Sequence, residues 1–199
     1  MNLLKQSLMM SLFLSTGSLT FSSQAGTEHD LCAYDKAEML AMEPWDFDQE
    51  DDGWRRLDVH EECYEAAADL IRTYYQNYAE ENPLERSMIW HEGQLRADIG
   101  QTEEAIELFK QSERSDEDTY GWNYYVRASI AFLQDDYETL MINREKLASL
   151  PKPDDLPAMR DDEGNEIEFP WPLNLHVVDS MVACFGRDYA QAYKGCVDD

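Results

Sequence analysis

Apolar and polar positions alternate at helical spacing along most of this chain, and short polar breaks divide the pattern into segments. The clearest segment is 86–113, where apolar or small residues recur three or four positions apart on both sides of Gly100. Gly93 and Ala105 lie twelve positions apart, one on each side of the break, so two helix backbones are expected to approach closely there. Thr102 is expected to cap the second helix, because its hydroxyl accepts from an unpaired amide. The segment therefore predicts a helical hairpin.

The same periodicity predicts an all-α chain of short helical hairpins. The first unit combines a helix over 30–42, an acidic and aromatic loop after Pro44, and a long helix over 58–80. Proline and glycine interrupt the pattern near 151–172, where an irregular loop or a small β-hairpin is expected as an insertion. The expected hairpins lie near 30–80, 86–113, 122–148 and 174–196.

The two central hairpins repeat with a period of 35 residues, from Gly93 to Ala128, and about 34 residues is the period of the tetratricopeptide repeat (TPR). The pattern of the first of these hairpins resembles that family. A bulky residue is followed four positions later by a small residue, and then come a glycine at the turn, Glu-Ala-Ile and an aromatic residue. This resemblance implies a helical solenoid in which stacked hairpins bury their faces against one another. It rests on Ile89, Gly93, Gly100, Glu104, Ala105, Ile106 and Phe109.

The resemblance also implies a binding face. In TPR proteins the first helices of the repeats line a concave groove that holds an extended peptide or a partner helix. An aromatic and polar face of this kind suits protein recognition, because aromatic anchors supply much of the binding energy. The alternative, that Tyr125 and Phe132 in particular are core between layers, stays open. The expected binding residues are Trp90, His91, Gln94, Asp98, Trp122, Tyr125, Ser129 and Phe132.

The first 25 residues have the pattern of a secretory signal peptide. Lys5 is their only charged residue, an apolar run follows at 8–14, and Ser23 and Ala25 fit a cleavage site with small residues. The run is too short for a membrane span. The pattern predicts a mature helical domain over 26–199 that is periplasmic or secreted, and an uncleaved N-terminal anchor is the alternative.

Four cysteines fit an oxidising compartment. Four thiols allow three connectivities, and local pairing of Cys32 with Cys63 and of Cys184 with Cys196 is favoured. A continuous helix over 188–195 would oppose the second pair, because a rise of about 1.5 Å per residue carries its end away from Cys184. A redox-active thiol pair and a zinc site are disfavoured, since no Cys-x-x-Cys motif occurs and no histidine lies at zinc-finger spacing from a pair of cysteines.

The charge balance limits the kinds of partner that this chain is expected to bind. Asp and Glu number 42 against 16 Lys and Arg, which gives a formal net charge of −26. Nucleic acid and anionic membrane surfaces are therefore disfavoured as partners, whereas a basic protein or a cation is permitted. The primary reading is an exported module that binds a protein or peptide, and no cofactor is expected.

Two other classes are weaker. Asp48, Glu50, Asp52 and Gly53 are spaced as in a calcium loop, but Val59 stands where such a loop needs a bidentate glutamate. A structural protein that binds calcium or another cation through the loops at 46–52 and 161–168 is one alternative, although no metal ligand is assigned.

Catalysis is not expected. The four histidines are scattered, and Leu95 replaces the second histidine of a His-Glu-x-x-His motif that would begin at His91. No nucleophile elbow, phosphate loop or dinucleotide fingerprint occurs. A hydrolase with an unrecognised site is the remaining alternative.

Overall fold

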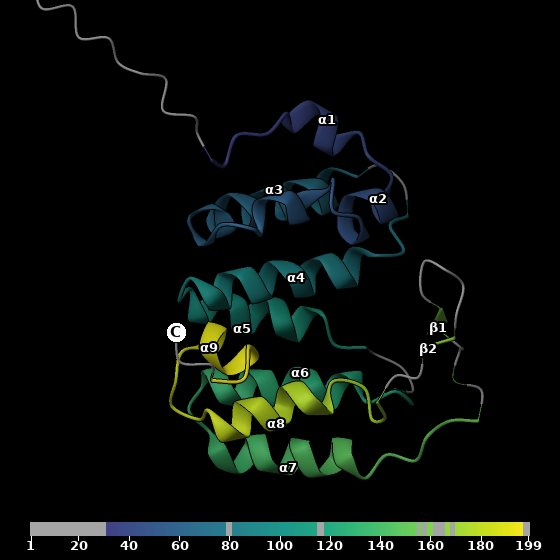
Figure 1. Cartoon of the computed structure of the whole chain (residues 1–199), viewed down its shortest axis with the longest axis vertical. Coiled ribbons are helices and arrows are strands. Elements are labelled where there is room, and N and C mark those ends of the chain that lie inside the picture. The colour runs from purple at the N-terminus through teal and green to yellow at the C-terminus, as the bar shows by residue number, and fades with distance from the viewer. Residues whose placement is uncertain are drawn as a thin grey trace, which may run out of the picture. The chain divides into compact units, whose positions relative to one another are not determined.

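The computed structural model describes most of the chain after residue 30 and is mostly α-helical, as the periodicity predicted (Figure 1). The predicted signal peptide at 1–25 lies outside the described residues, and so does the greater part of 155–169. The described residues are 31–78, 81–114, 118–154, 156, 159–160, 166–167 and 170–196.

The first unit differs from its prediction in how its helices begin. Helix α1 is short (Lys36–Leu40), and Asp35 caps it by accepting from the amides of Ala37 and Glu38 at 2.9 and 3.1 Å. The helix was predicted to begin at Asp30, and this residue lies outside the described residues. Further helices of this unit are α2 (Pro44–Gln49), the 3₁₀ turns η1 (Trp54–Leu57) and η2 (Glu61–Cys63), and α3 (Tyr64–Asn77).

The expectation of an acidic loop after Pro44 was wrong, because Pro44 begins α2. Proline suits the first helical position, where its missing N–H would have no intrahelical partner. Of the three aromatic residues that follow Pro44 in this segment, Phe47 and Trp54 are buried, whereas Trp45 is 59% exposed.

The central helices coincide with the two predicted hairpins at 86–113 and 122–148. They are α4 (Glu85–Asp98), α5 (Thr102–Gln111), α6 (Trp122–Leu133) and α7 (Tyr137–Ala148). Thr102 is the first helical residue, not the cap, and Gln101 at the cap position makes no side-chain hydrogen bond. Asp136 caps α7 by accepting from the Thr139 amide at 3.0 Å.

Gly93 permits the close contact between α4 and α5. A Cβ at this position would lie 2.7 Å from ring atoms of Phe109 and 3.3 Å from Cβ of Leu108. The small residue is therefore required, but its nearest neighbours are these two side chains and not Ala105 as the spacing suggested.

The C-terminal part holds a minimal strand pair and two helices. Strands β1 (Met159–Arg160) and β2 (Glu166–Ile167) pair antiparallel within the interrupted region. Helices α8 (Leu175–Ala183) and α9 (Tyr189–Tyr193) follow.

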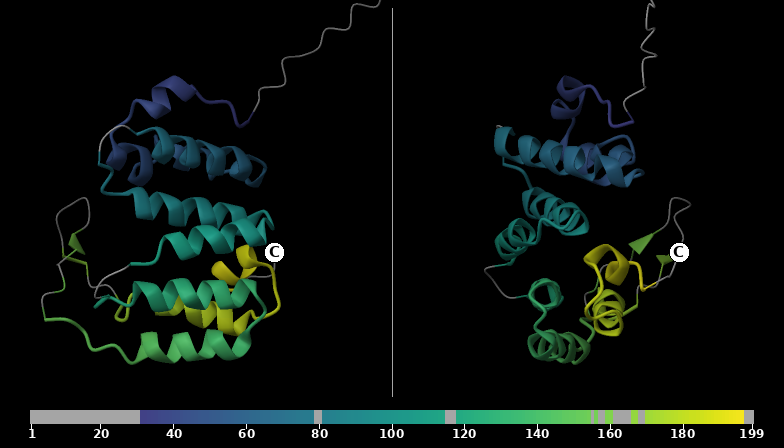
Figure 2. Two further views of the ribbon diagram at one scale, coloured as in Figure 1. Left: turned by 180° about the vertical axis from the view of Figure 1, so that it is seen from behind. Right: turned by 90° about the vertical axis from the view of Figure 1, so that its left-hand side faces the viewer.

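Helices α3 to α9 pack mainly in chain order, each against the next. Two further contacts, α6 with α8 and α4 with α9, bring the C-terminal pair back onto the central hairpins. Figure 2 shows α8 and α9 together on one side of the central helices.

Two apolar clusters hold the helices. One surrounds α3 and includes Phe47, Trp54 and Tyr74, and the other surrounds α6 and includes Trp90 and Phe109. Between α3, α4 and α5 lies a buried ion-pair network. Its centre is Glu92, which Arg72 contacts at 2.6 Å and to which the Tyr75 hydroxyl donates at 2.7 Å.

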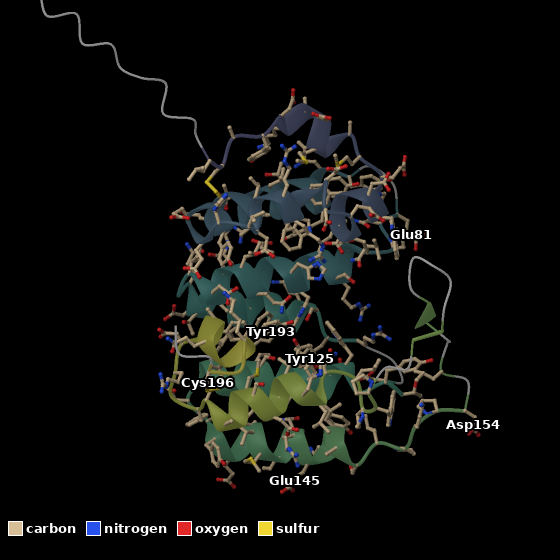
Figure 3. All side chains as sticks on the ribbon, in the orientation of Figure 1. Glu81, Tyr125, Glu145, Asp154, Tyr193 and Cys196 are labelled. Atoms are coloured by element: carbon tan, nitrogen blue, oxygen red, sulfur yellow. A yellow bond between two sulfur atoms is a disulfide. The ribbon has the colours of Figure 1, made fainter. Side chains whose placement is uncertain are left out.

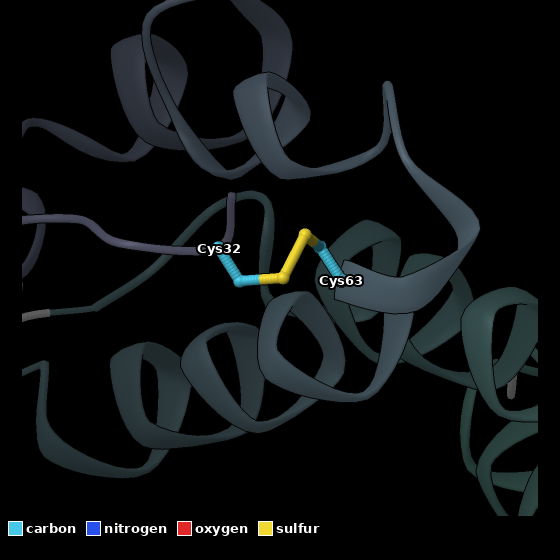
Figure 4. Close-up of a disulfide and its surroundings, with 2 residues drawn as sticks. All are labelled: Cys32 and Cys63. Carbon is cyan, nitrogen blue, oxygen red and sulfur yellow. A yellow bond between two sulfur atoms is a disulfide. The ribbon is translucent and has the colours of Figure 1, made fainter. Parts of the chain in front are cut away.

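Both favoured disulfides are present. Cys32 pairs with Cys63 (Figure 4), with 5.3 Å between their Cα atoms, and Cys184 pairs with Cys196, with 5.8 Å between theirs. The second bridge is possible because α9 ends at Tyr193, and Gly195 then turns the chain with a φ of 91°. Among the described residues, no helix has the length and apolar character needed to cross a membrane.

Candidate functional site

The eight predicted binding residues lie on α4 and α6, but half of them are buried. Trp90 is 4% exposed, Tyr125 2%, Phe132 4% and Ser129 0%. The expectation of an open aromatic face was therefore wrong at these four positions. The physical reason is ring packing, because Trp90 stacks on Phe109 at 4.2 Å between ring centroids and lies 4.9 Å from Tyr125.

Trp122 is partly buried and fixed at one edge. Its indole Nε1 donates to the backbone carbonyl of Ser112 at 2.8 Å, and its ring meets that of Trp90 edge to face at 5.0 Å. Trp122 therefore joins the end of α5 to the start of α6 and contributes to the core.

Helix α9 of the same chain packs over the part of the predicted face that includes Tyr125 and Phe132 (Figures 2 and 3). Tyr189 lies 6.0 Å from Phe109 and 6.3 Å from Phe132 between ring centroids, and it is 4% exposed. The rings of Tyr193 and Tyr189 lie 5.9 Å apart between their centroids, and Tyr193 also neighbours Tyr125. Burial raises the pKa of Tyr125 well above its ordinary value, and Tyr193 adds to this rise. We call Phe109, Tyr125 and Phe132 the covered face.

Three predicted residues on α4 are partly exposed: His91, Gln94 and Asp98. They do not form one site. His91 points to Asp48 of α2, with 2.8 Å between its Nδ1 and Oδ1 of Asp48, whereas Gln94 and Asp98 adjoin α9.

The His91–Asp48 pair is a buried polar contact between α2 and α4. Asp48 is fully buried, and it accepts from Nε1 of Trp54 at 3.0 Å and from Nε2 of Gln49 at 2.5 Å. Burial acts to raise the pKa of Asp48, but the hydrogen bond and charge of His91, together with these two donors, hold it below its ordinary value. An ionised carboxylate with its hydrogen bonds satisfied is expected here.

This pair bears on both weaker alternatives. Asp48 is helical and already engaged by three side chains, so it is not a free ligand of a calcium loop. Within the part of the chain that the structure describes, no group of three or more His, Cys, Asp or Glu side chains is arranged to hold a metal ion. The predicted loop at 161–168 lies mostly outside the described residues. A carboxylate that orients a histidine also occurs in hydrolases, but among the described residues His91 hydrogen-bonds only Asp48.

Three carboxyl groups influence one another electrostatically near the end of α4. They belong to Asp58, Glu61 and Asp98, and we call them the carboxylate cluster. Burial raises the pKa of Asp98 to about 7, and Asp58 and Glu61 add to this rise. The Lys194 ammonium opposes it and lies 3.8 Å from Oε1 of Glu61, in an ion pair whose two side chains are 60% and 77% exposed.

One buried polar atom of this cluster, Oδ1 of Asp98, has no hydrogen-bond partner among the described residues. Burial raises the pKa of Tyr189 well above its ordinary value, Tyr193 and Asp98 add to the rise, and Gln94 and Ser129 oppose it. Buried polar atoms are rarely left unpaired in folded proteins, so Oδ1 of Asp98 is an exception at the end of α4.

Sequence reasoning missed the residues that face Asp98. Asp58 and Glu61 belong to a region predicted as one helix, and Lys194 belongs to a helix predicted only as a terminal cap. Their meeting depends on the contact between α4 and α9, for which the sequence carries no local signal. The available signal was the Tyr189-x-x-x-Tyr193-Lys194 spacing, which marks one aromatic side of α9 with a basic end.

The arrangement is chemically suited to hold a cation of the size of an ammonium or guanidinium group. The Lys194 ammonium pairs with Glu61 and its charge opposes the raised pKa of Asp98, and Val59, which lies between Asp58 and Glu61 in the sequence, is 72% exposed. Comparisons of this chain with protein-family models, with curated proteins and with solved structures gave no match.

Proposed function

We propose that this chain is an exported helical-repeat module, similar to TPR proteins, that binds a basic segment of another protein at the carboxylate cluster. The stacked pairs α4–α5 and α6–α7 support a short solenoid, with an irregular or β-hairpin insertion near 151–172. The leader pattern at 1–25 and the two disulfides support a periplasmic or secreted location.

The observation that carries the proposal is the contact of Lys194 with the carboxylate cluster. The charge of Lys194 opposes the raised pKa of Asp98, and its ammonium lies 3.8 Å from Oε1 of Glu61. Arg55, Lys194 and His91 all oppose the raised pKa of Asp58. The cluster thus already holds the chemical group that a basic partner would bring, in an exposed ion pair that contributes little to stability.

The whole chain favours the same kind of partner. Acidic residues outnumber basic ones by 42 to 16, and six of the basic side chains, counted in the described part, already pair with acids inside the chain. The surrounding negative potential would speed the approach of a basic protein, most strongly at low ionic strength.

A labelled peptide rich in lysine, such as four Lys-Ala-Ala units, tests the proposal by fluorescence anisotropy. We expect the oxidised chain to bind it, and the triple variant Asp58→Asn/Glu61→Gln/Asp98→Asn to bind at least about tenfold more weakly. A charge-matched control is Glu103→Gln/Glu138→Gln/Glu145→Gln, which neutralises three exposed acids on α5 and α7.

The control should keep most of the affinity of the wild type. Equal losses in the two triple variants would mean that diffuse acidity attracts the peptide, and the proposed site would be wrong. Binding that neither variant changes would also contradict it.

A further inference from the structure

We infer that Cys32 and Cys196 are the two positions at which the folded chain exchanges disulfides with an external thiol compound. The mixed disulfide forms on these two sulfurs only, and Cys63 and Cys184 close the bridges from inside the fold. The inference goes beyond the proposed function and does not depend on the basic partner. It starts from the unequal burial of the two cysteines in each bridge.

Each bridge joins a buried cysteine to a partly exposed one. Cys63 is 0% exposed and belongs to the apolar cluster around α3, and Cys184 is 2% exposed and belongs to the cluster around α6. Their partners, Cys32 and Cys196, are partly exposed and pack against these clusters from outside. The same polarity therefore occurs twice, although the two bridges belong to different clusters.

The elements that carry the cysteines explain this polarity. Cys63 lies in η2 directly before α3, and Cys184 caps the end of α8, so both are held at helix ends within the core. Cys32 lies in a turn before α1, and Cys196 follows the end of α9. Figure 4 shows the first bridge, which runs from a non-helical segment to the start of a helix. The exposed member of each bridge thus belongs to the less enclosed segment.

Burial decides which sulfur an external thiolate can reach. In thiol–disulfide exchange a thiolate attacks one sulfur of a disulfide, and the other sulfur leaves as a thiolate with the bonding electrons. The burial of Cys63 and Cys184 denies a solvent thiolate access to their sulfurs in the folded chain. Attack on Cys32 forms the mixed disulfide there and releases Cys63 as the thiolate. Attack on Cys196 releases Cys184 in the same way.

Formation of each bridge follows the same route in reverse. The thiolate of Cys32 attacks an external disulfide, which forms the mixed disulfide and releases one thiol. The thiolate of Cys63 then attacks the sulfur of Cys32, which closes the bridge and releases the second thiol. The external disulfide is reduced to two thiols while the two cysteines are oxidised, so electrons and protons balance.

The positions of the buried cysteines favour this second step. The Cα atoms of the two bridges are already 5.3 and 5.8 Å apart in the packed fold, so closure is intramolecular and needs no rearrangement of the helices. Oxidation can therefore follow the packing of the helices, because the entering reagent meets only the partly exposed cysteine of each pair. The bridges are substrates of exchange and not redox catalysts.

Variants that lack one cysteine of a bridge, with the other bridge intact, test the assignment. Cys63→Ala leaves the Cys32 thiol, and Cys32→Ala leaves the Cys63 thiol within the core. Cys184→Ala and Cys196→Ala are the matched pair at the second bridge. Each mature variant is incubated with glutathione disulfide, and the formation of the mixed disulfide is followed by intact-mass spectrometry.

We expect Cys63→Ala to be glutathionylated at least about 100-fold faster than Cys32→Ala, because a buried thiol reacts only when its surroundings open. The same ratio is expected for Cys184→Ala over Cys196→Ala. In concentrated urea the four variants should react at similar rates, since the fold no longer protects any thiol. Similar rates in the folded variants, or faster reaction of a buried thiol, would overturn the inference.

A measurement on the wild type keeps the inference testable if the variants do not fold. The oxidised chain is treated with excess reduced glutathione and quenched with acid, which stops exchange by protonating thiolates. Peptide mapping then locates the adducts. We expect them on Cys32 and Cys196 of the folded chain and on all four cysteines in urea. Adducts on Cys63 or Cys184 of the folded chain would contradict the inference, as would adducts confined to the urea sample.

Discussion

At the scale of single residues, Asp98 is the most informative group. Burial raises the pKa of its carboxyl to about 7, against the opposing charge of Lys194, and its Oδ1 has no partner among the described residues. Asp58, Glu61, Tyr189 and Lys194 face it from three other elements. The raised pKa of Asp98 therefore marks it as a group whose charge the fold opposes.

Asp98 should make the fold less stable as the pH rises. In the unfolded chain the carboxyl ionises near pH 4, whereas in the folded chain it stays protonated until about pH 7. Between these values the folded state binds more protons, so the free energy of unfolding falls with rising pH and levels off above pH 7.

The variant Asp98→Asn removes this dependence. We expect its free energy of unfolding, minus that of the wild type, to increase by about 3–4 kcal/mol from pH 4 to pH 7.5, measured by urea denaturation at each pH. The difference isolates Asp98 from the other titrating groups, which both proteins share. A difference that stays constant over this range would show that the fold does not raise the pKa of Asp98.

At the scale of elements, the contact between α4 and α5 shows how a sequence pattern becomes a packing requirement. Gly93 lies against the ring of Phe109, and that ring is itself fully buried beneath Trp90. The ring is closely surrounded, because Trp90 stacks on it and Tyr189 lies 6.0 Å away between ring centroids. One missing Cβ therefore sets the separation of the two helices.

The substitution Gly93→Ala should destabilise the fold although alanine favours helices. Its Cβ would lie 2.7 Å from two ring atoms of Phe109 and would force the ring to shift. We expect a loss of about 1–3 kcal/mol in the free energy of unfolding, measured by urea denaturation. Glu103→Ala on the exposed side of α5 is the control and should change stability by at most about 0.5 kcal/mol. A more stable Gly93→Ala protein would contradict this packing.

The same contact explains why Trp90 is unsuitable as a marker of binding. Its ring is 4% exposed and stacks between Phe109 and the rings of α6. We expect Trp90→Ala to lose about 3–5 kcal/mol of stability in thermal or urea denaturation, as other buried aromatic truncations do. A loss below about 1 kcal/mol would show that the ring is not part of the core.

At the scale of the whole molecule, the helices and disulfides were accessible from the sequence, because helical spacing and cysteine number are local or countable properties. The packing of α9 onto α4 was not accessible. It brings residues near position 60 together with residues near 98 and 194, and that depends on the tight return of α8 and α9. Trp90 and Tyr125 were assigned to an open face for the same reason, because the sequence does not reveal that the chain covers this face itself.

The central claim is that a basic protein binds at the carboxylate cluster, and photocrosslinking in the native host tests it most directly. A benzophenone amino acid replaces Val59, which is 72% exposed between Asp58 and Glu61, so the cluster stays intact. The control position is Ile142, an apolar residue of α7 that is 43% exposed. The account predicts an adduct with a basic protein from position 59 only, and its loss in the Asp58→Asn/Glu61→Gln/Asp98→Asn background. An adduct that survives this neutralisation, or no adduct from position 59, would contradict it.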